Sequence, residues 1–137
     1  MIAVLDASVV IEIVLGTRTG ATLRSRLADP RISLHSPELV DLEVLNVLRR
    51  LMGSDTVAPT RVAAAAERLG ELDLRRHRHG PMLRRIWSWR GNLTMYDAAY
   101  VTLAEVLGGP LLTTDGRLAN APGLTVPVEV FATERAR

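Results

Sequence analysis

The chain has 137 residues, a length that suits one domain, and 47% of them are hydrophobic, which is enough for a buried core. It has no cysteine, which excludes disulfides, cysteine zinc sites and a thiol nucleophile. All 17 basic residues are arginine and the formal net charge is +2, so a lysine catalyst is also excluded. Asp6 and Glu12 interrupt the first apolar run, so we expect no signal peptide. No apolar stretch is long enough to span a bilayer, and a cytoplasmic protein is expected.

The first half of the chain alternates apolar runs with helical patterns. Ile2–Leu5 is a continuous apolar run of the kind that forms a strand buried on both faces. Ser36-Pro37-Glu38 predicts the start of a helix, with a capping serine, a proline at the first helical position and an acid in the first turn. In this half we expect strands at 2–5 and 32–34 and helices at 7–15, 21–27, 38–52 and 59–69.

The second half continues the same alternation. Thr94-Met95-Tyr96-Asp97 matches a capping box that opens a helix, and Pro127 indicates that the last strand lies at an edge of the sheet. We expect strands at 72–74, 111–114 and 125–130 and helices at 81–90, 94–107 and 116–119. Residues 1–131 then form one domain, and residues 132–137 are expected to be a flexible tail.

Alternating strands and helices favour an α/β fold in which helices join parallel strands. In such a fold, ligands bind beyond the carboxyl ends of the strands. Asp6 directly follows the first apolar run and Asp115 follows the run 111–114, so we expect both acids at that edge of the sheet. Glu43 lies within a largely apolar helix, and Asp97 opens another.

Each acid also has a purely structural interpretation when it is taken alone. Asp6 precedes a helix and is as readily an N-cap, and Asp97 belongs to a capping box. Asp115 and the glycine after it resemble an ordinary strand-to-helix turn. Glu43 is harder to explain in this way, because its neighbours on the helix surface are mostly apolar.

Taken together, the four acids predict a site for a divalent cation. Two carboxylates about 4 Å apart repel each other by roughly 4 kcal/mol at an effective dielectric constant near 20. Ligands that are all oxygen favour Mg²⁺ or Mn²⁺ over zinc, and His77 and His79 lie among arginines rather than near the acids. A metal held by acids activates water and stabilises a phosphate under attack, which indicates phosphodiester hydrolysis.

Four segments resemble the PIN domain of the VapC toxins. The most specific part is Tyr96-Asp97-Ala98-Ala99-Tyr100 followed by Thr113-Thr114-Asp115. The resemblance covers nearly the whole chain in the right order, in the segments 4–8, 36–43, 93–101 and 111–118.

The resemblance implies a three-layer α/β/α sandwich around a central, mostly parallel sheet of about four or five strands. It also implies a Mg²⁺-dependent endoribonuclease, the toxin of a type II toxin–antitoxin pair. The catalytic acids of the family carry over to Asp6, Glu43, Asp97 and Asp115. Asp6, Asp97 and Asp115 would hold the metal, while Glu43 would orient or deprotonate the attacking water.

The resemblance further implies which side chains lie near this site and which molecules the protein binds. Ser8 and Thr113 fall where the family has small hydroxyl residues. The implied partners are an RNA substrate, a cognate VapB-type antitoxin and a second copy of the chain in a homodimer, with no membrane. We hypothesise that a basic side chain of the antitoxin enters the acid pocket in place of the cation.

A basic segment between residues 75 and 90 carries six arginines, two histidines and two tryptophans. We expect Arg84 and Arg85 to bind RNA phosphates and Trp89 to stack on a base. The competing interpretation is a solvated basic face, with Trp87, and also Trp89, packed in the core.

Two other classes of protein stay open. An aspartyl-phosphate protein also places an aspartate at a strand end, but most such sites use a lysine, and the dehalogenase-like pattern needs a second aspartate where this chain has Ser8. The alternative function is that of a non-catalytic RNA- or protein-binding PIN-like module, which keeps the fold without the activity.

Overall fold

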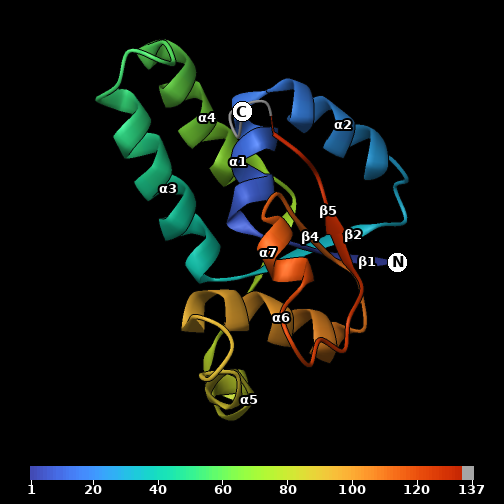
Figure 1. Ribbon diagram of the computed structural model, residues 1–137. Coiled ribbons are helices and arrows are strands. Elements are labelled where there is room, and N and C mark those ends of the chain that lie inside the picture. Colours follow the sequence, from blue (N-terminus) through green and yellow to red (C-terminus); the bar gives the residue numbers. More distant parts are fainter. Residues whose placement is uncertain (134–137) are drawn as a thin grey trace.

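The structure is a computed structural model that describes residues 1–133 (Figure 1). Five strands form a single sheet in the order β3-β2-β1-β4-β5, and every neighbouring pair is parallel. In chain order the strands are β1 Ile2–Leu5, β2 Ser33–Pro37, β3 Leu74–His77, β4 Leu111–Thr113 and β5 Val128–Val130. The predicted α/β fold with a parallel central sheet is confirmed.

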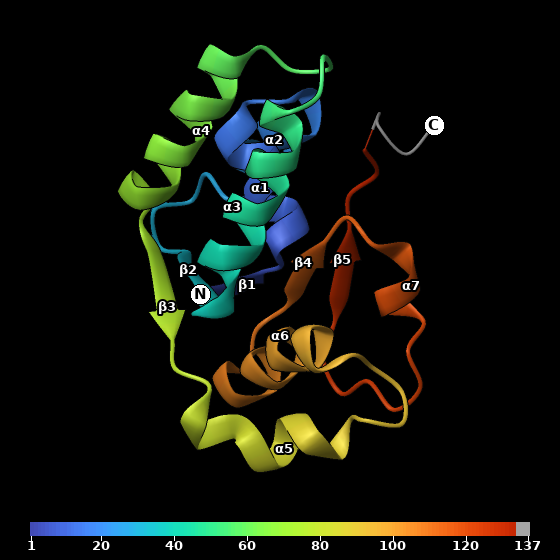
Figure 2. The ribbon, with the colours of Figure 1, turned by 90° about the vertical axis from the view of Figure 1, so that its left-hand side faces the viewer.

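Helices cover both faces of the sheet, which confirms the three-layer arrangement (Figure 2). Helices α1 to α4 lie on one side and α5 and α6 on the other. Their bounds are α1 Ala7–Leu15, α2 Arg18–Arg26, α3 Leu39–Met52, α4 Pro59–Glu71, α5 Leu83–Ser88, α6 Met95–Leu107 and α7 Gly116–Ala119, with a short 3-10 turn, η1, at Gly80–Met82. None of these helices is long and apolar enough to cross a bilayer.

The order of the strands creates a switch point between β1 and β4. The chain adds β2 and β3 on one side of β1, and then β4 and β5 on the other. Ligands bind in the crevice at such a point, outside the carboxyl ends of the strands. The register pairs Leu5 with Leu112, so the next residues, Asp6 and Thr113, meet at this edge. The amide of Asp6 donates to the carbonyl oxygen of Leu112 at 3.0 Å.

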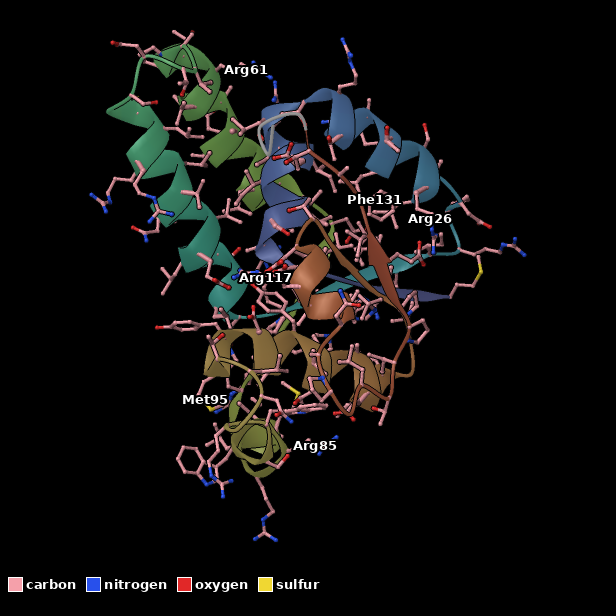
Figure 3. All side chains as sticks on the ribbon, in the orientation of Figure 1. Arg26, Arg61, Arg85, Met95, Arg117 and Phe131 are labelled. Carbon is pink, nitrogen blue, oxygen red and sulfur yellow. The ribbon has the colours of Figure 1, made fainter. Side chains whose placement is uncertain are left out.

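Helix α1 is almost entirely buried and begins directly after Asp6. Its last three carbonyl oxygens, which have no partner within the helix, accept hydrogen bonds from guanidinium groups on α2 and α4 at 2.6–3.1 Å. The donors are Arg24, Arg61 and Arg68 (Figure 3 labels Arg61). Cations at a helix C-terminus also complement its dipole. These bonds anchor the helix that positions Asp6.

Strand β2 continues through Ser36, which we predicted to cap a helix. That prediction is wrong. The Ser36 hydroxyl is fully buried and donates to the carbonyl oxygen of Leu5 at 2.6 Å, so it ties β2 to β1. Helix α3 starts only at Leu39, with no side-chain cap. The local pattern fits a helix cap, but pairing with β3 carries β2 as far as Pro37.

Other boundaries also differ from those predicted. Helix α2 starts three residues early, because Thr17 caps it by accepting a hydrogen bond from the amide of Gly20 at 3.0 Å. Strand β3 lies further along the chain than 72–74, and the last strand is shorter but lies at the edge as predicted. At the end of the domain, Thr19 Oγ1 donates to the carbonyl oxygen of Ala132 at 3.0 Å. Residues 134–137 of the predicted tail lie outside the described residues.

Candidate active site

Asp6 is the most deeply buried of the four predicted acids, with 8% of its surface exposed. It occupies the N-cap position of α1, but its side chain makes no capping bond. Instead its Oδ2 accepts hydrogen bonds from Thr113 Oγ1 at 2.7 Å and from Ser8 Oγ at 3.1 Å. Burial raises the pKa of the Asp6 carboxyl, the two hydroxyls oppose that rise, and the charge of Asp97 adds to it. The N-cap interpretation therefore does not account for this carboxylate.

Two hydroxyls join the ends of β1 and β4. Thr113 Oγ1 also accepts from the amide of Asp115 at 3.0 Å, and Ser8 Oγ accepts from the amide of Thr114 at 3.0 Å. Both hydroxyls donate to the same oxygen of Asp6, which leaves its Oδ1 without a hydroxyl donor. The network fixes the carboxylate in one orientation.

Glu43 lies on α3 and is half-buried. Its Oε1 accepts a hydrogen bond of 2.7 Å from the hydroxyl of Tyr100, a side chain on α6 that is fully buried. Burial raises the pKa of Glu43, the Tyr100 bond opposes this, and the charges of Asp6 and Asp97 raise it further. We assigned no role to Tyr100 from the sequence, although its place three residues after Asp97 puts both on one helix face.

Asp97 serves the helix with its amide and the site with its carboxylate. The amide donates to Thr94 Oγ1 at 3.1 Å, which confirms that Thr94 caps α6. The carboxylate is half-buried. Burial raises its pKa, Thr94 lowers it, the charge of Asp115 raises it and Arg117 lowers it. The structural and functional interpretations of Asp97 therefore hold together.

Asp115 differs from the other three acids because an arginine is bound to its carboxylate. It caps α7, with Oδ1 accepting from the amide of Arg117 at 3.0 Å. The Arg117 guanidinium donates to both carboxylate oxygens, Nε to Oδ1 at 3.2 Å and Nη2 to Oδ2 at 3.1 Å. Figure 3 labels Arg117 beside α7. These bonds hold the pKa of Asp115 below its usual value.

The acids line two hollows at this edge of the sheet. Glu43 lines a hollow of about 540 Å³ together with Ala7, Tyr96 and side chains of α3. Asp97 and Asp115 line another, of about 370 Å³. The charge of Asp97 acts on both Asp6 and Glu43, so the structure brings these three acids into one electrostatic group.

The four acids do not form a complete set of metal ligands in this conformation. Within residues 1–133, no three carboxylate or imidazole groups are arranged to hold a metal ion as they stand, and Asp115 is turned to Arg117. The donor chemistry nevertheless fits a hard divalent cation. Asp6, Glu43 and Asp97 offer only oxygen ligands, form no ion pair among the described residues, and have pKa values raised by burial and by the charges of neighbouring acids.

The structure contradicts part of the predicted RNA-binding set. Trp89 is only 4% exposed and packs in the core, so the prediction that it stacks on a base is wrong. Arg85 lies over that ring, 4.7 Å from its centroid, and pairs with Glu105 on α6 at 2.7 Å. Arg85 therefore has a structural role that the sequence did not reveal.

The exposed tryptophan of this segment is Trp87, whose surface is 60% exposed. Arg90 lies over its ring at 4.9 Å from the centroid, and Arg84 is exposed without an ion pair among the described residues. The interpretation in which both tryptophans pack in the core is therefore wrong for Trp87. The buried residues of this segment are Met82, Ile86 and Trp89, whose spacing of four and three residues is that of one helix face.

The chain matches the family model of the PIN domain over residues 3–124. It is 39% identical over 128 residues to Ribonuclease VapC1 of Mycobacterium tuberculosis, covering 93% of this chain and 96% of that protein. It is 35% identical over 129 residues to Ribonuclease VapC12 of the same organism, covering 94% and 98%. The chain therefore belongs to the PIN domain family, and within it to the group of VapC ribonucleases.

Solved structures show the same fold. The crystal structure of VapBC2 from Rickettsia felis, bound to a DNA fragment from its promoter, matches with a TM-score of 0.70 at 11% identity over 96% of this chain and 99% of that one. Mycobacterium tuberculosis VapC20, a toxin that cleaves the sarcin–ricin loop, matches with a TM-score of 0.65 at 20% identity over 90% and 96%.

Proposed function

We propose that this chain is a metal-dependent endoribonuclease that hydrolyses RNA phosphodiester bonds, and the toxin of a type II toxin–antitoxin pair. One observation carries the proposal. Three carboxylates that form no ion pair within residues 1–133, Asp6, Glu43 and Asp97, gather at the switch point of a PIN domain. The similarity to VapC ribonucleases over nearly the whole chain supports RNA as the substrate.

Asp6 and Asp97 would hold a Mg²⁺ or Mn²⁺ ion, and Asp115 would join them once it leaves Arg117. Such an ion, when bound, neutralises the acids, lowers the pKa of a bound water and stabilises charge on the phosphate. Ser8 and Thr113 keep the Asp6 carboxylate aimed by holding its Oδ2. They thus support the ligand without contacting the substrate.

Glu43 would orient or deprotonate the attacking water. Its raised pKa moves it toward the range in which a carboxylate accepts a proton near neutral pH. Tyr100 donates to Oε1 and fixes the rotamer, which leaves Oε2 for the water. The roles divide between a deeply buried ligand, Asp6, and a half-buried base, Glu43.

A toxin of this kind requires an inhibitor, so we include a cognate VapB-type antitoxin as the partner, and a second copy of the chain in a homodimer. The similarity to the VapBC2 complex supports the former. An antitoxin side chain that inserts a guanidinium among the acids would act as Arg117 already does on Asp115. We place the activity in the cytoplasm, where cellular RNA is found.

The test is cleavage of total cellular RNA by the purified chain, freed of any antitoxin, with Mg²⁺, with EDTA, and with Asp97→Asn. We expect discrete fragments that require both the metal and Asp97, and mapping of their ends would identify the cleavage site. Folded protein that cleaves no RNA under any of these conditions would contradict the proposal and favour the non-catalytic binding module.

A further inference from the structure

Arg117 is paired with Asp115, one of the four acids of the candidate site, through an exposed contact. Its side chain is 92% exposed, and among the described residues its only side-chain partner is Asp115. Ion pairs this exposed contribute about 0–1 kcal/mol, so a divalent cation that binds Asp115 competes with a weak contact. Some paired arginines are held by more groups. Arg76, for example, also donates to three backbone carbonyls besides Asp41.

Arg117 also lies within reach of the other acids. It lines the hollow that Asp97 and Asp115 share, together with Asn92 and Asn120. Its charge lowers the pKa of Asp97, and the charge of Asp97 raises that of Arg117. If Asp115 turned away, the guanidinium would remain in a hollow of about 370 Å³ beside the predicted cleavage site.

We propose that Arg117 is a substrate-positioning residue that exchanges partners. It holds Asp115 while no divalent cation is bound, and it binds the RNA phosphate once the cation has taken that carboxylate. The inference rests on the proposed function and extends it to a residue outside the acid set. A planar guanidinium suits this exchange, because its donors match either a carboxylate or a phosphate in a bidentate manner.

The chain supplies a matched control at the opposite end of the strands. Arg31 pairs with Asp29 in the same way, two residues apart, with its amide at 2.9 Å and Nη2 at 2.7 Å from the carboxylate. Its side chain is 79% exposed. The pair precedes β2, whereas Asp115 follows β4, so the two arginine turns lie at opposite ends of parallel strands.

The first measurement is the affinity for Mn²⁺, detected by electron paramagnetic resonance. It compares the unchanged chain with Arg117→Ala, Arg117→Gln and Arg31→Ala. Removing a competitor for Asp115 should tighten Mn²⁺ binding by about two- to five-fold, the equivalent of one exposed ion pair. Arg31→Ala should leave the affinity unchanged. Affinity that is the same or weaker in both Arg117 variants would overturn the exchange.

The second measurement is the affinity for a labelled single-stranded RNA in a Glu43→Gln background, which keeps the proposed metal ligands and slows cleavage. Mg²⁺ should tighten RNA binding, and Arg117→Ala should reduce this gain by about three-fold or more, since the freed guanidinium is then missing. An equal loss with and without Mg²⁺ would mark a contact independent of the exchange and would overturn it.

The two proposals fail separately. If the unchanged chain cleaves RNA with Mg²⁺ and Arg117→Ala leaves both affinities as they were, only the exchange is wrong. If the unchanged chain does not cleave RNA at all, the proposed function is wrong, whatever Arg117 does.

Discussion

Two groups of carboxylates in this protein have opposite surroundings. The arginine-paired acids, among them Asp29, Glu105 and Glu129, each contact a guanidinium at 2.7 Å, and their pKa values are lowered. The unpaired acids, Asp6, Glu43 and Asp97, meet hydroxyl and amide groups instead, and their pKa values are raised. Within residues 1–133, none of the arginines pairs with these three acids. The difference separates carboxylates that stabilise the fold from carboxylates that we propose bind a cation.

Asp115 belongs to both groups. It stands at the carboxyl end of β4 beside the unpaired acids, yet it is bound by Arg117 like the paired ones. Its pair is also the most exposed on the arginine side. This intermediate position is what makes an exchange of partners plausible in physical terms, because the contact that must be broken is a weak one.

The largest expected effect is on RNA cleavage, and it comes from replacing an unpaired acid with its amide. The same replacement of a paired acid is the control. Asp97→Asn should lower RNA cleavage by about 100-fold or more, since losing a metal ligand forfeits several kcal/mol of transition-state stabilisation. It should also raise the free energy of unfolding without metal by about 0.5–1 kcal/mol, because repulsion is relieved at a half-exposed site. RNA cleavage in Mg²⁺ and urea unfolding without metal measure the two effects.

The matched control is Asp41→Asn on α3, which breaks the pair with Arg76. It should keep cleavage and lower the free energy of unfolding by about 0.5–1 kcal/mol. If both substitutions changed the free energy of unfolding in the same direction, the division into two groups of acids would be wrong.

A pair of buried threonines tests how the site carboxylate is held. Thr113→Val removes the hydroxyl that donates to Asp6 at 2.7 Å and should cost about 1.5–3 kcal/mol, as expected for a hydrogen bond to a charged group. Thr102 is equally buried, but its hydroxyl has no hydrogen-bond partner among the described residues. Thr102→Val should therefore be neutral or stabilise by about 1 kcal/mol. Thermal and urea unfolding decide, and equal costs at both sites would contradict the role given to Thr113.

The two groups of acids should also give stability opposite slopes with pH. An unfolded carboxylate titrates near pH 4. The unpaired acids have raised folded-state pKa values, so above about pH 4 the folded chain holds protons that the unfolded chain has released, and stability falls as pH rises through the raised values. The arginine-paired acids have lowered values, so their contribution is full above about pH 4 and is lost as pH falls.

Urea unfolding between roughly pH 5 and 8 leaves out the paired acids, which are already ionised in both states, but it includes His35, whose lowered pKa makes stability rise with pH. Comparison with Asp97→Asn, which keeps His35, separates the contribution of the unpaired acids. Without metal, we expect the free energy of unfolding of the unchanged chain to fall, relative to that of Asp97→Asn, as pH rises, and we expect Mg²⁺ to reduce this difference in slope. Equal slopes for the two chains without metal would show that Asp97 does not contribute as an unpaired acid.

The smallest effects concern the basic surface of α5. Arg84→Ala should weaken RNA binding by a few-fold and reduce its dependence on salt, as expected for one lost phosphate contact. Arg85→Ala should instead lower stability, since Arg85 is bound to Glu105 and covers Trp89. Fluorescence anisotropy at several salt concentrations compares them. An Arg84 variant with unchanged affinity and salt slope would remove this surface from the RNA path.

The sequence was informative where the pattern had one physical explanation. Asp6 and Asp115 were placed correctly because each follows an apolar run that forms a strand, and the carboxyl ends of parallel strands lie at the same end of the sheet. Thr94 was identified as a cap because its capping box is local. Each of these depends on contacts within a few residues.

The sequence was misleading where long-range contacts decide. Ser36 fits a helix cap locally, but the carbonyl of Leu5, 31 residues away, holds its hydroxyl in the sheet. Trp87 and Trp89 differ by two positions, and the segment offers two overlapping apolar faces, of which the one with Met82, Ile86 and Trp89 packs against the core. The bond from Tyr100 to Glu43 joins two helices and has no local signal.

The most direct test of the central claim is the stability of the chain against urea with and without Mg²⁺. Ligand binding stabilises by an amount that reaches about 2.7 kcal/mol at 100 times the dissociation constant. We predict a gain of this kind for the unchanged chain and for Asp41→Asn, and little or none for Asp97→Asn. A gain that is absent from all three, or equal in all three, would show that the unpaired acids are not a cation site.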